Sequence, residues 1–388
     1  MKAWPKVALA DIAPIVRRPV EIRHDQAYPE LGIRSFGKGT FHKPPISGSE
    51  VGSKRLFRIE AGDLVFSNVF AWEGAIAVAS QADAGRFGSH RFITCAVDDS
   101  RADATYLKHY LTASPDGRAQ VLQASPGGAG RNRTLGVKKM GKILIPLPPL
   151  AVQQAVVARL DALAEKTREV EAHLDAVERD VEHLLALRFR DVIADAPLRA
   201  MAEVAPLVRR EVSIDAEKSY TELGVRSFYK GSFHRRTVPG SDFSWQDLYR
   251  VKAGDLVFSN IMAWEMAIAV AVAEDDGCVG NHRMLTCEAR PDTAVPGFLW
   301  FYFTTEDGFA KVYAASPGTA ARNRTMTASA LMAIDVPVPP LAAQQTFGRL
   351  QAAVAALKAK HAAIRQANTA IIPAALERIF SIEVPAHA

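Results

Sequence analysis

Two stretches of the chain place their seam residues at alternating spacings of three and four, the period of a long helix that packs along one face. The first stretch follows a proline cluster at 146–149, and its seam positions are Leu160, Leu163, Thr167, Val170, Leu174, Val177, Val181 and Leu184. The second follows a cluster at 337–340, with Leu350, Val354, Leu357, His361, Ile364, Asn368, Ile371 and Ala375. Proline suits the start of a helix and not its interior, so the pattern predicts heptad helices over 149–196 and 340–388.

His361 and Asn368 interrupt the apolar seam of the second helix. Either they weaken the packing locally, or they fix its register and orientation, as polar seam residues can. The two helices also differ in charge, since residues 150–196 carry net −4 and residues 341–388 carry net +3. Opposite charges favour pairing of the two helices with each other as a coiled coil.

The residues before each helix, 1–148 and 197–339, follow a different pattern. Short apolar runs at 64–66 and 75–78, bounded by glycine, aspartate and serine, predict strands. The runs at 106–113 and 296–304 predict short helices that pack on such strands. We therefore expect an α+β protein with two mixed α/β domains, each followed by one long helix.

The two halves of the chain repeat each other. The octapeptide AGDLVFSN at 61–68 recurs at 253–260, and Val-Arg-Arg at 16–18 recurs at 208–210. Further matches, in the same order, are Arg-Ser-Phe at 34–36 and 226–228, Ala-Trp-Glu at 71–73 and 263–265, and Arg-Asn-Arg-Thr at 131–134 and 322–325. Such matches indicate a tandem duplication of a whole domain together with its helix, not a short repeat.

The composition is that of an ordinary globular protein, with 388 residues, 48% of them hydrophobic, and a net charge of +5. Residues 1–149 are net +8, as expected of a DNA-binding domain, whereas residues 197–340 are net −2. No apolar run approaches the ~20 residues that span a bilayer, and we identify no signal peptide. The three cysteines, Cys95, Cys278 and Cys287, lack Cys-x-x-Cys spacing, so we expect free thiols and a cytoplasmic protein.

Each proline cluster continues into a related motif, PLPPLAVQQ at 146–154 and PVPPLAAQQ at 337–345. Together with AGDLVFSN and Ala-Trp-Glu, duplicated in this order, these motifs resemble the specificity subunit of type I restriction-modification systems over nearly the whole chain. The resemblance implies two target-recognition domains, 1–148 and 197–339, each of which reads one half of a split double-stranded DNA site through the major groove. It also implies that the two helices pair antiparallel as a spacer between the domains.

The same resemblance implies partners. Two methyltransferase subunits, which hold S-adenosylmethionine, would dock on this chain, and restriction (translocase) subunits would join them. The chain itself would hold no cofactor and contribute no catalytic residue.

Glycine-rich loops at 37–43 and 229–235 combine a flexible backbone with lysine, histidine and a terminal cation. Such loops can bring N–H groups and cations to phosphates, or histidine and lysine to base edges. With the arginine before each loop, the candidate DNA-binding residues are Arg34, Lys38, His42, Lys43, Arg226, Lys230, His234 and Arg235. The alternative is an ordinary solvated loop.

Two turns of identical sequence are further candidates, made of Arg131, Asn132 and Arg133 and of Arg322, Asn323 and Arg324. Two arginines that flank an asparagine suit a phosphate clamp, or readout of guanine by arginine and of adenine by asparagine. The alternative is a turn whose arginines pair with carboxylates of their own domain.

The remaining candidates are two pairs in each half. Ser67 and Asn68, with their copies Ser259 and Asn260, end an apolar strand and either contact DNA or cap the turn. His90 and Arg91 recur as His282 and Arg283, so both halves have the same polar residues at matching positions. His42, His90 and Glu73 lack the spacing of metal ligands, so we expect no metal site.

We identify no motif for amino-methyl transfer, dinucleotide binding or a P-loop, which favours a DNA-reading subunit without activity of its own. Two alternatives stay open: a nuclease or methyltransferase whose active site is unrecognised, and a coiled-coil scaffold that binds only proteins. Because both copies keep the same polar residues, we expect two nearly identical half-sites, read as an interrupted palindrome. The copies differ at 43–58 against 235–250, and at Gly74 against Met266.

Overall fold

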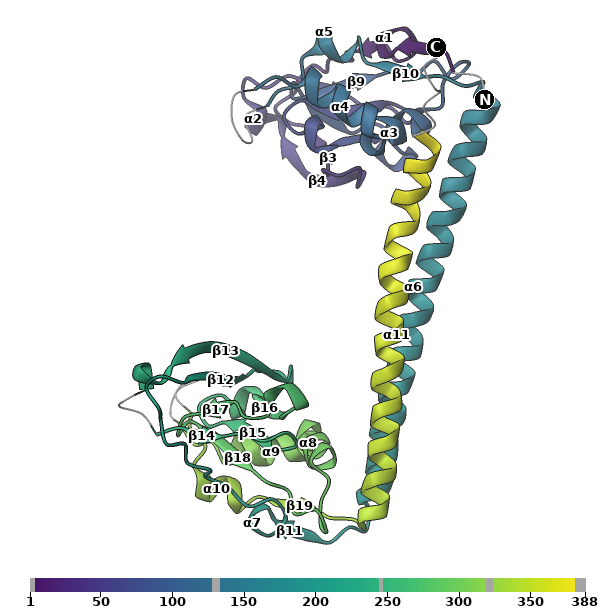
Figure 1. Ribbon diagram of the computed structural model, residues 1–388. Helices are drawn as coiled ribbons and strands as arrows, with labels where there is room; N and C mark the ends of the chain where they lie inside the picture. The colour runs from purple at the N-terminus through teal and green to yellow at the C-terminus, as the bar shows by residue number, and fades with distance from the viewer. Residues whose placement is uncertain (1–3, 128–132, 244–246, 319–323, 381–388) are drawn as a thin grey trace. The chain divides into compact units, whose positions relative to one another are not determined.

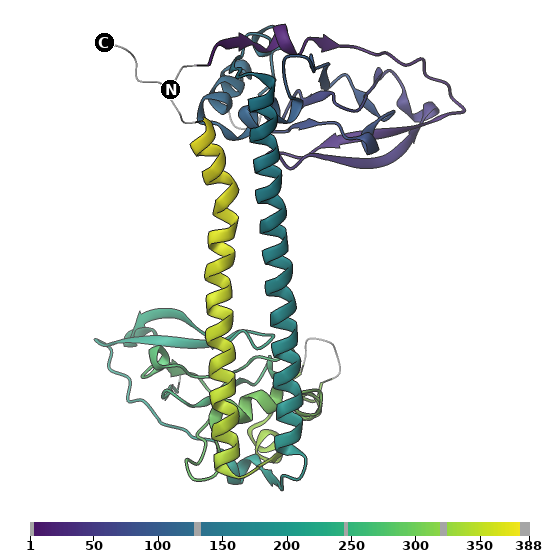
Figure 2. The ribbon, with the colours of Figure 1, turned by 90° about the vertical axis from the view of Figure 1, so that its right-hand side faces the viewer.

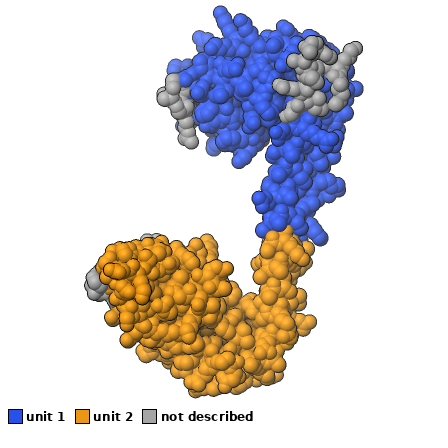
Figure 3. Space-filling model, in the orientation of Figure 1, with its two compact units in different colours: residues 1–174, 362–388 blue, residues 175–361 orange. Residues whose placement is uncertain are grey.

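The computed structural model describes residues 4–127, 133–243, 247–318 and 324–380 (Figure 1). The chain divides into two compact units (Figure 3): unit 1 comprises residues 1–174 and 362–388, and unit 2 comprises residues 175–361. Each unit holds one α/β domain together with one half of each long helix. The predicted class, mixed α/β domains with long helices, is confirmed.

The first domain and its helix contain, in chain order, β1 (Lys6–Ala8), α1 (Leu9–Ile12), β2 (Ile15–Val16), β3 (Ala27–Ile33), β4 (Thr40–Ser47), α2 (Gly48–Val51), β5 (Leu56–Arg58), β6 (Leu64–Ser67), η1 (Ala71–Glu73), β7 (Ile76–Val78), η2 (Gln81–Asp83), β8 (Phe87–Ser89), β9 (Phe92–Cys95), α3 (Ala104–Ala113), α4 (Pro115–Ala124), α5 (Val137–Met140), β10 (Leu144–Pro146) and α6 (Leu150–Ile193). The label η marks a 3-10 helix. The helix predicted over 106–113 is α3, which begins two residues earlier.

The second domain and its helix contain β11 (Leu198–Ala200), α7 (Met201–Val204), β12 (Ser219–Val225), β13 (Ser232–Pro239), η3 (Gly240–Phe243), β14 (Tyr249–Arg250), β15 (Leu256–Ser259), η4 (Ala263–Glu265), β16 (Ile268–Val270), η5 (Ala273–Asp275), β17 (Val279–Gly280), β18 (Met284–Cys287), α8 (Pro296–Thr304), α9 (Glu306–Ala314), α10 (Ala328–Met332), β19 (Asp335–Pro337) and α11 (Leu341–Phe380). The predicted helix over 296–304 is α8.

Each domain is built on two main sheets with a separate strand pair. The orders are β2-β9-β6-β7 and β4-β3-β8-β5 in the first domain, and β16-β15-β18 and β13-β12-β17-β14 in the second. The strand from the repeated octapeptide is central in its sheet: β6 pairs antiparallel with both β7 and β9. Its residues are buried on both faces, which is why Leu-Val-Phe reads as a continuous apolar run. The outer pair, β1 with β10 or β11 with β19, leads into the long helix.

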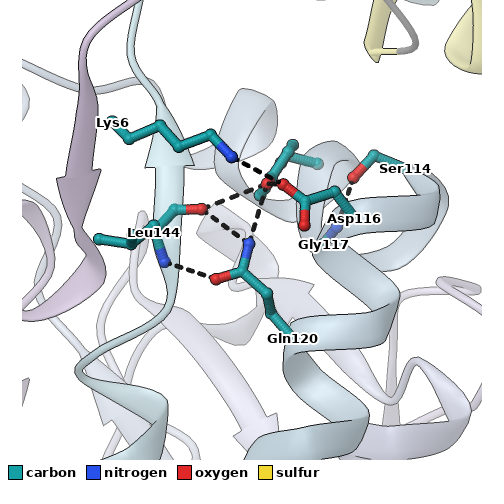
Figure 4. Close-up of polar contacts among 7 residues, drawn as sticks. Lys6, Ser114, Asp116, Gly117, Gln120 and Leu144 are labelled. Carbon is teal, nitrogen blue, oxygen red and sulfur yellow. Dashed lines mark hydrogen bonds and ion pairs between the residues drawn. The ribbon is translucent and has the colours of Figure 1, made fainter. Parts of the chain in front are cut away.

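A polar network fastens α4 to β10, the strand that precedes α6 (Figure 4). The Gln120 amide accepts a hydrogen bond from the Leu144 N–H at 2.8 Å and donates one to the Leu144 carbonyl at 2.9 Å. Asp116 accepts hydrogen bonds from Tyr110 at 2.8 Å and from Lys6 at 3.3 Å. These contacts join segments that are distant in sequence, and they hold β10, the strand that precedes α6, against α4.

The long helices pair antiparallel in each unit (Figure 2). In unit 1, Arg365 of α11 donates to Glu171 of α6 at 3.2 Å; in unit 2, Lys358 donates to Glu182 at 2.5 Å. The opposite net charges of the two helices therefore correspond to specific ion pairs between them. None of the helices in the described part of the chain is long and apolar enough to cross a membrane.

His361 and Asn368 are buried at the helix seam, as their heptad positions predict. His361 Nδ1 lies 2.9 Å from the Glu178 carboxylate, and Asn368 Nδ2 donates to the Thr167 carbonyl and the Glu171 carboxylate, each at 2.9 Å. A shift of one helix along the other would leave these buried groups without those partners, which is costly. The contacts favour the register-fixing interpretation over simple local weakening.

The predicted seam is wrong at four positions. Val170, Leu184, Ile364 and Ile371 are 38%, 42%, 44% and 40% exposed. The residue that follows each of them is at least partly buried, notably Leu185 on α6 and the paired Glu171 and Arg365. The pair Glu171–Arg365 therefore occupies the seam positions that the apolar pattern assigned to Val170 and Ile364.

In unit 1 the exposed apolar residues Val170, Ile364 and Ile371 each lie three residues after a seam residue of their own helix. Equivalent offsets from the seam fall on the same side of an antiparallel pair, because a two-fold axis across the pair relates the helices. The helix pair of unit 1 therefore presents a partly exposed apolar face, which we call the outer helix face.

Each long helix ends in the domain of the other repeat. Phe189, near the end of α6, is buried between Phe298 and Phe301 of α8 and Phe347 of α11, with ring centroids 5.0, 4.8 and 5.2 Å away. Phe380, the last residue of α11, lies 5.5 Å from Tyr106 and 5.6 Å from Tyr110 of α3. Each domain is thus completed by a helix end from the other half of the sequence.

Candidate nucleic-acid interface

The hairpin of β3 and β4 carries the first group of candidates at its tip. Residues 34–39 turn the chain through a left-handed conformation at Phe36 (φ 62°), Gly37 (66°) and Gly39 (80°). The tip is held against η1, because the Phe36 N–H donates to the Glu73 carbonyl at 2.8 Å and the Gly37 N–H donates to the Gly74 carbonyl at 2.9 Å. The tip is therefore a supported loop, not a free one.

Two cations of this hairpin differ in how they are held. Arg34 folds back, donating to the Thr40 carbonyl at 2.5 Å and lying over the Phe41 ring at 5.0 Å. Lys38 is exposed and lies 6.0 Å from the centre of the Phe36 ring. In the second domain Arg226 contacts the Ser232 carbonyl and the Phe233 ring in the same way, and Lys230 lies 5.8 Å from the Phe228 ring. Lys43 and Arg235 follow on β4 and β13.

A buried carboxylate positions the histidine of each hairpin. Asp83 accepts hydrogen bonds from His42 and Thr40, each at 2.9 Å, and from the Ser80 N–H and hydroxyl at 2.8 Å. Burial raises the pKa of Asp83, but the hydrogen bonds from Ser80, His42 and Thr40 outweigh burial and hold the pKa below its ordinary value. His234 lies 3.1 Å from Asp275 in the second domain. Each histidine is thus oriented by its own domain while its ring stays partly exposed.

Cys278 adds a thiol to the second histidine, 3.7 Å from its Nε2. The same Nε2 also meets Asp275, whereas a proton relay from cysteine to carboxylate uses both ring nitrogens. Burial, with Asp275 and Asp276 nearby, raises the pKa of the Cys278 thiol, so it stays protonated and a poor nucleophile. The pKa values of Cys95 and Cys287 are raised to about 12 by burial, and all three thiols are free.

The second group of candidates meets at Asn68. Its N–H donates to the Arg91 carbonyl at 2.7 Å, and its carbonyl accepts from the Leu135 N–H at 2.8 Å. The structure therefore brings the His90–Arg91 turn next to the chain that follows the Arg-Asn-Arg turn. Asn260 makes the same contacts with Arg283, which follows His282, and with Met326.

Of the two Arg-Asn-Arg turns, Arg131, Asn132, Arg322 and Asn323 lie outside the described residues. Arg133 donates to the Ser125 carbonyl at 3.4 Å and lies 6.0 Å from the Trp72 ring. Arg324 donates to the Ser316 carbonyl at 2.9 Å and lies 4.0 Å from the Tyr313 ring. Among the described residues, neither Arg133 nor Arg324 forms an ion pair with a carboxylate of its domain, which was the alternative raised by the sequence.

The two groups join at η1, which supports the hairpin tip through Glu73 and carries the Trp72 ring beside Arg133. In the first domain η1 therefore contacts both the hairpin tip and Arg133. Ser67 is buried in β6 opposite Phe92 and does not present its hydroxyl for contact. Ser259 is only partly buried.

Asn68 and Asn260 share one further property. The Oδ1 atom of each is buried and has no hydrogen-bond partner within the described part of the chain. Trp72 and Trp264 close the adjoining turns by donating to the carbonyls of Val69 and Ile261 at 3.0 and 2.9 Å. Both tryptophans thus serve the turn.

Sequence reasoning missed two features of each domain. Arg18 and Arg210 form two-pronged pairs with the buried Asp63 and Asp255, so the repeated Val-Arg-Arg has a structural role. Their recurrence together with Ala-Gly-Asp was the signal that could have revealed it. The exposure of Phe36 and Phe228 was also unforeseen, because an apolar letter in a loop does not say where its ring points.

Among the described residues, no group of three or more histidine, cysteine, aspartate or glutamate side chains could hold a metal ion.

No protein-family model matches the sequence, and no curated protein matches it. Solved structures do match. The HsdS subunit from Thermoanaerobacter tengcongensis is 20% identical, with a TM-score of 0.66 over 99% of this chain and 98% of that chain. A structure that reports complex assembly and conformational transition of the type I R-M system is 21% identical, with a TM-score of 0.69 over 98% of each chain. The chain therefore has the fold of a type I restriction-modification specificity subunit.

Proposed function

We propose that this chain is a non-catalytic specificity subunit that reads a split site in double-stranded DNA. The observation that carries the proposal is that both domains repeat the same contacts around the candidate surface, which consists of the hairpin tip, the 3-10 helix beneath it and the asparagine after the central strand. In both domains a cation-bearing hairpin tip rests on a 3-10 helix, and an asparagine joins the strand end to the following arginine-bearing loop. Two equivalent surfaces on one chain suit two half-sites of similar sequence.

The proposal includes partners of the kind that the fold suggests. Two methyltransferase subunits would supply S-adenosylmethionine and the transfer chemistry, and restriction subunits would join them, while this chain holds no cofactor. Three buried free thiols suit the reducing cytoplasm, where such a complex would meet DNA.

Selection of bound duplexes from a random pool tests the proposal directly. We expect one enriched sequence with two nearly identical half-sites on opposite strands, separated by a spacer of fixed length. Two unrelated half-sites would place specificity in the segments where the copies differ, 43–58 and 235–250. No enrichment would refute DNA reading, and methylation or cleavage by the purified chain alone would refute the non-catalytic role.

Substitution of the described arginines of the two turns should weaken DNA binding without unfolding the protein. Arg133→Ala and Arg324→Ala are each expected to cost about 1–3 kcal/mol, because both guanidinium groups lie beside the proposed DNA-binding surface, each held by a backbone carbonyl and an aromatic ring. Relaxed preference at one base pair would indicate base contact, whereas uniform weakening would indicate phosphate contact. Arg188→Ala, on the exposed side of α6, is the control and should bind normally.

The outer helix face is expected to bind the methyltransferase. Ile364→Lys combined with Ile371→Lys should abolish co-purification with the methyltransferase encoded beside this chain, because it places two charges in an apolar contact. Both side chains are partly exposed, so melting of the chain alone should change little. Gln366→Lys, exposed on the same helix, is the control. Light scattering that shows the double variant still bound would remove this face from the interface.

A further inference from the structure

The two most exposed aromatic side chains at the candidate surface are Phe36 and Phe228, which are 74% and 62% exposed. They occupy equivalent positions at the tips of the two hairpins. Single exposed apolar residues are common on protein surfaces, so exposure alone says little. Here the same large ring is exposed twice, on two surfaces that otherwise carry cations and glycine.

The backbone makes phenylalanine an unfavourable choice at both positions. Phe36 has φ 62° and Phe228 has φ 60°, in the left-handed region where a residue with a side chain is strained and glycine is not. Neither packing nor backbone geometry therefore accounts for a phenylalanine at the hairpin tip.

Both tips are held firmly by the domain beneath them. Ser35 donates to the Glu73 carboxylate at 3.1 Å, and Ser227 donates to Glu265 at 3.3 Å, in addition to the backbone bonds from Phe36 and Phe228. In the second domain the hydroxyl of Tyr229 donates to the Phe303 carbonyl at 2.6 Å. A ring on a supported tip loses little freedom when it enters a contact, which favours binding.

A lysine accompanies each exposed ring. The ammonium groups of Lys38 and Lys230 lie 6.0 and 5.8 Å from the ring centres of Phe36 and Phe228. An apolar ring with a cation at this distance matches the edge of a duplex, where a base step lies beside a phosphate. An apolar protein pocket would instead require the ammonium to lose its water.

We propose that Phe36 and Phe228 are wedge residues, each of which enters a base step of the half-site bound by its own domain and partly unstacks it. Lys38 and Lys230 then hold the adjoining phosphate. This inference rests on the proposed function, that the two domains read duplex DNA. It adds a deformation of the DNA to the direct contacts, so that easily unstacked steps are preferred at two positions of the site.

The test uses the full chain and the duplex selected from the random pool, with 2-aminopurine placed in turn at each adenine. Wild type should raise the fluorescence at one position in each half-site, and Phe36→Gly with Phe228→Gly should abolish both signals. The double variant should lose roughly five- to 150-fold in affinity for each lost ring contact. Because glycine accepts the left-handed backbone, the melting temperature of the double variant should equal or exceed that of wild type.

Leu198→Ala is the matched control, since Leu198 is 61% exposed on β11, outside the hairpins. It should leave affinity and fluorescence unchanged. If the double glycine variant keeps both signals, the wedge is wrong while DNA reading stands. If it keeps its DNA affinity but loses the methyltransferase, the rings form a protein contact and the wedge is again wrong. If wild type selects no duplex, the proposed function itself fails.

Discussion

Asp255→Ala is expected to lower the free energy of unfolding of unit 2 by about 3 kcal/mol. Asp255 is buried and accepts hydrogen bonds from Arg210 at 2.6 and 3.0 Å and from the Lys252 N–H at 2.8 Å. Its removal leaves a largely buried guanidinium whose remaining charged partner among the described residues is Glu288, 3.0 Å away. Urea unfolding followed by tryptophan fluorescence measures the loss, and Asp63→Ala should have the same effect on unit 1 through Arg18.

Arg199→Ala supplies the control, because Arg199 and Glu203 form an exposed ion pair whose loss should cost less than about 1 kcal/mol. Arg210→Met combined with Asp255→Leu should recover part of the stability, since apolar residues can replace a buried pair that is removed as a whole. A loss for Asp255→Ala no larger than that of the control would show that the pair does not stabilise the domain.

Phe189→Ala should be the most damaging single substitution on the long helices, at about 3–5 kcal/mol. The ring fills the space between α8 and the start of α11, so its truncation leaves a cavity that three neighbouring phenylalanines cannot close. The expected result is early unfolding of unit 2 in a thermal melt.

Leu187→Ala, two residues away on the same helix and partly exposed, should change the stability by less than about 1 kcal/mol. Hydrogen exchange then locates the damage: amides of α8 should lose protection in Phe189→Ala and keep it in Leu187→Ala. Equal protection of α8 in both variants would contradict a closing role for the end of α6.

The elements of the fold were largely predictable because the two repeats support each other. The strand at 64–66 and the helix at 296–304 have local patterns that leave few alternatives, and proline marks the start of each long helix. The seam was less predictable, because two neighbouring residues of a heptad can both face the partner helix. The apolar pattern assigned Ile364 to the seam, whereas in the structure Arg365 lies there and pairs with Glu171 of α6.

The polar residues of the hairpin could be named from the sequence, but the geometry that holds them could not. Asp83 and Glu73 lie 41 and 38 residues along the chain from their hairpin partners His42 and Ser35. The burial of Ser67 was not foreseen because a strand end looks exposed in sequence, whereas Ser67 still pairs with Phe92 of β9.

The position of Phe380 has a consequence for synthesis. Unit 1 is discontinuous: residues 175–361, which form unit 2, are made before the helix end that covers Tyr106 and Tyr110. At about 5–20 residues per second, the ribosome needs roughly ten to forty seconds to make that intervening segment. During this delay the nascent first domain exposes an aromatic surface with no cover, so its need for a chaperone should peak while the second domain is being translated.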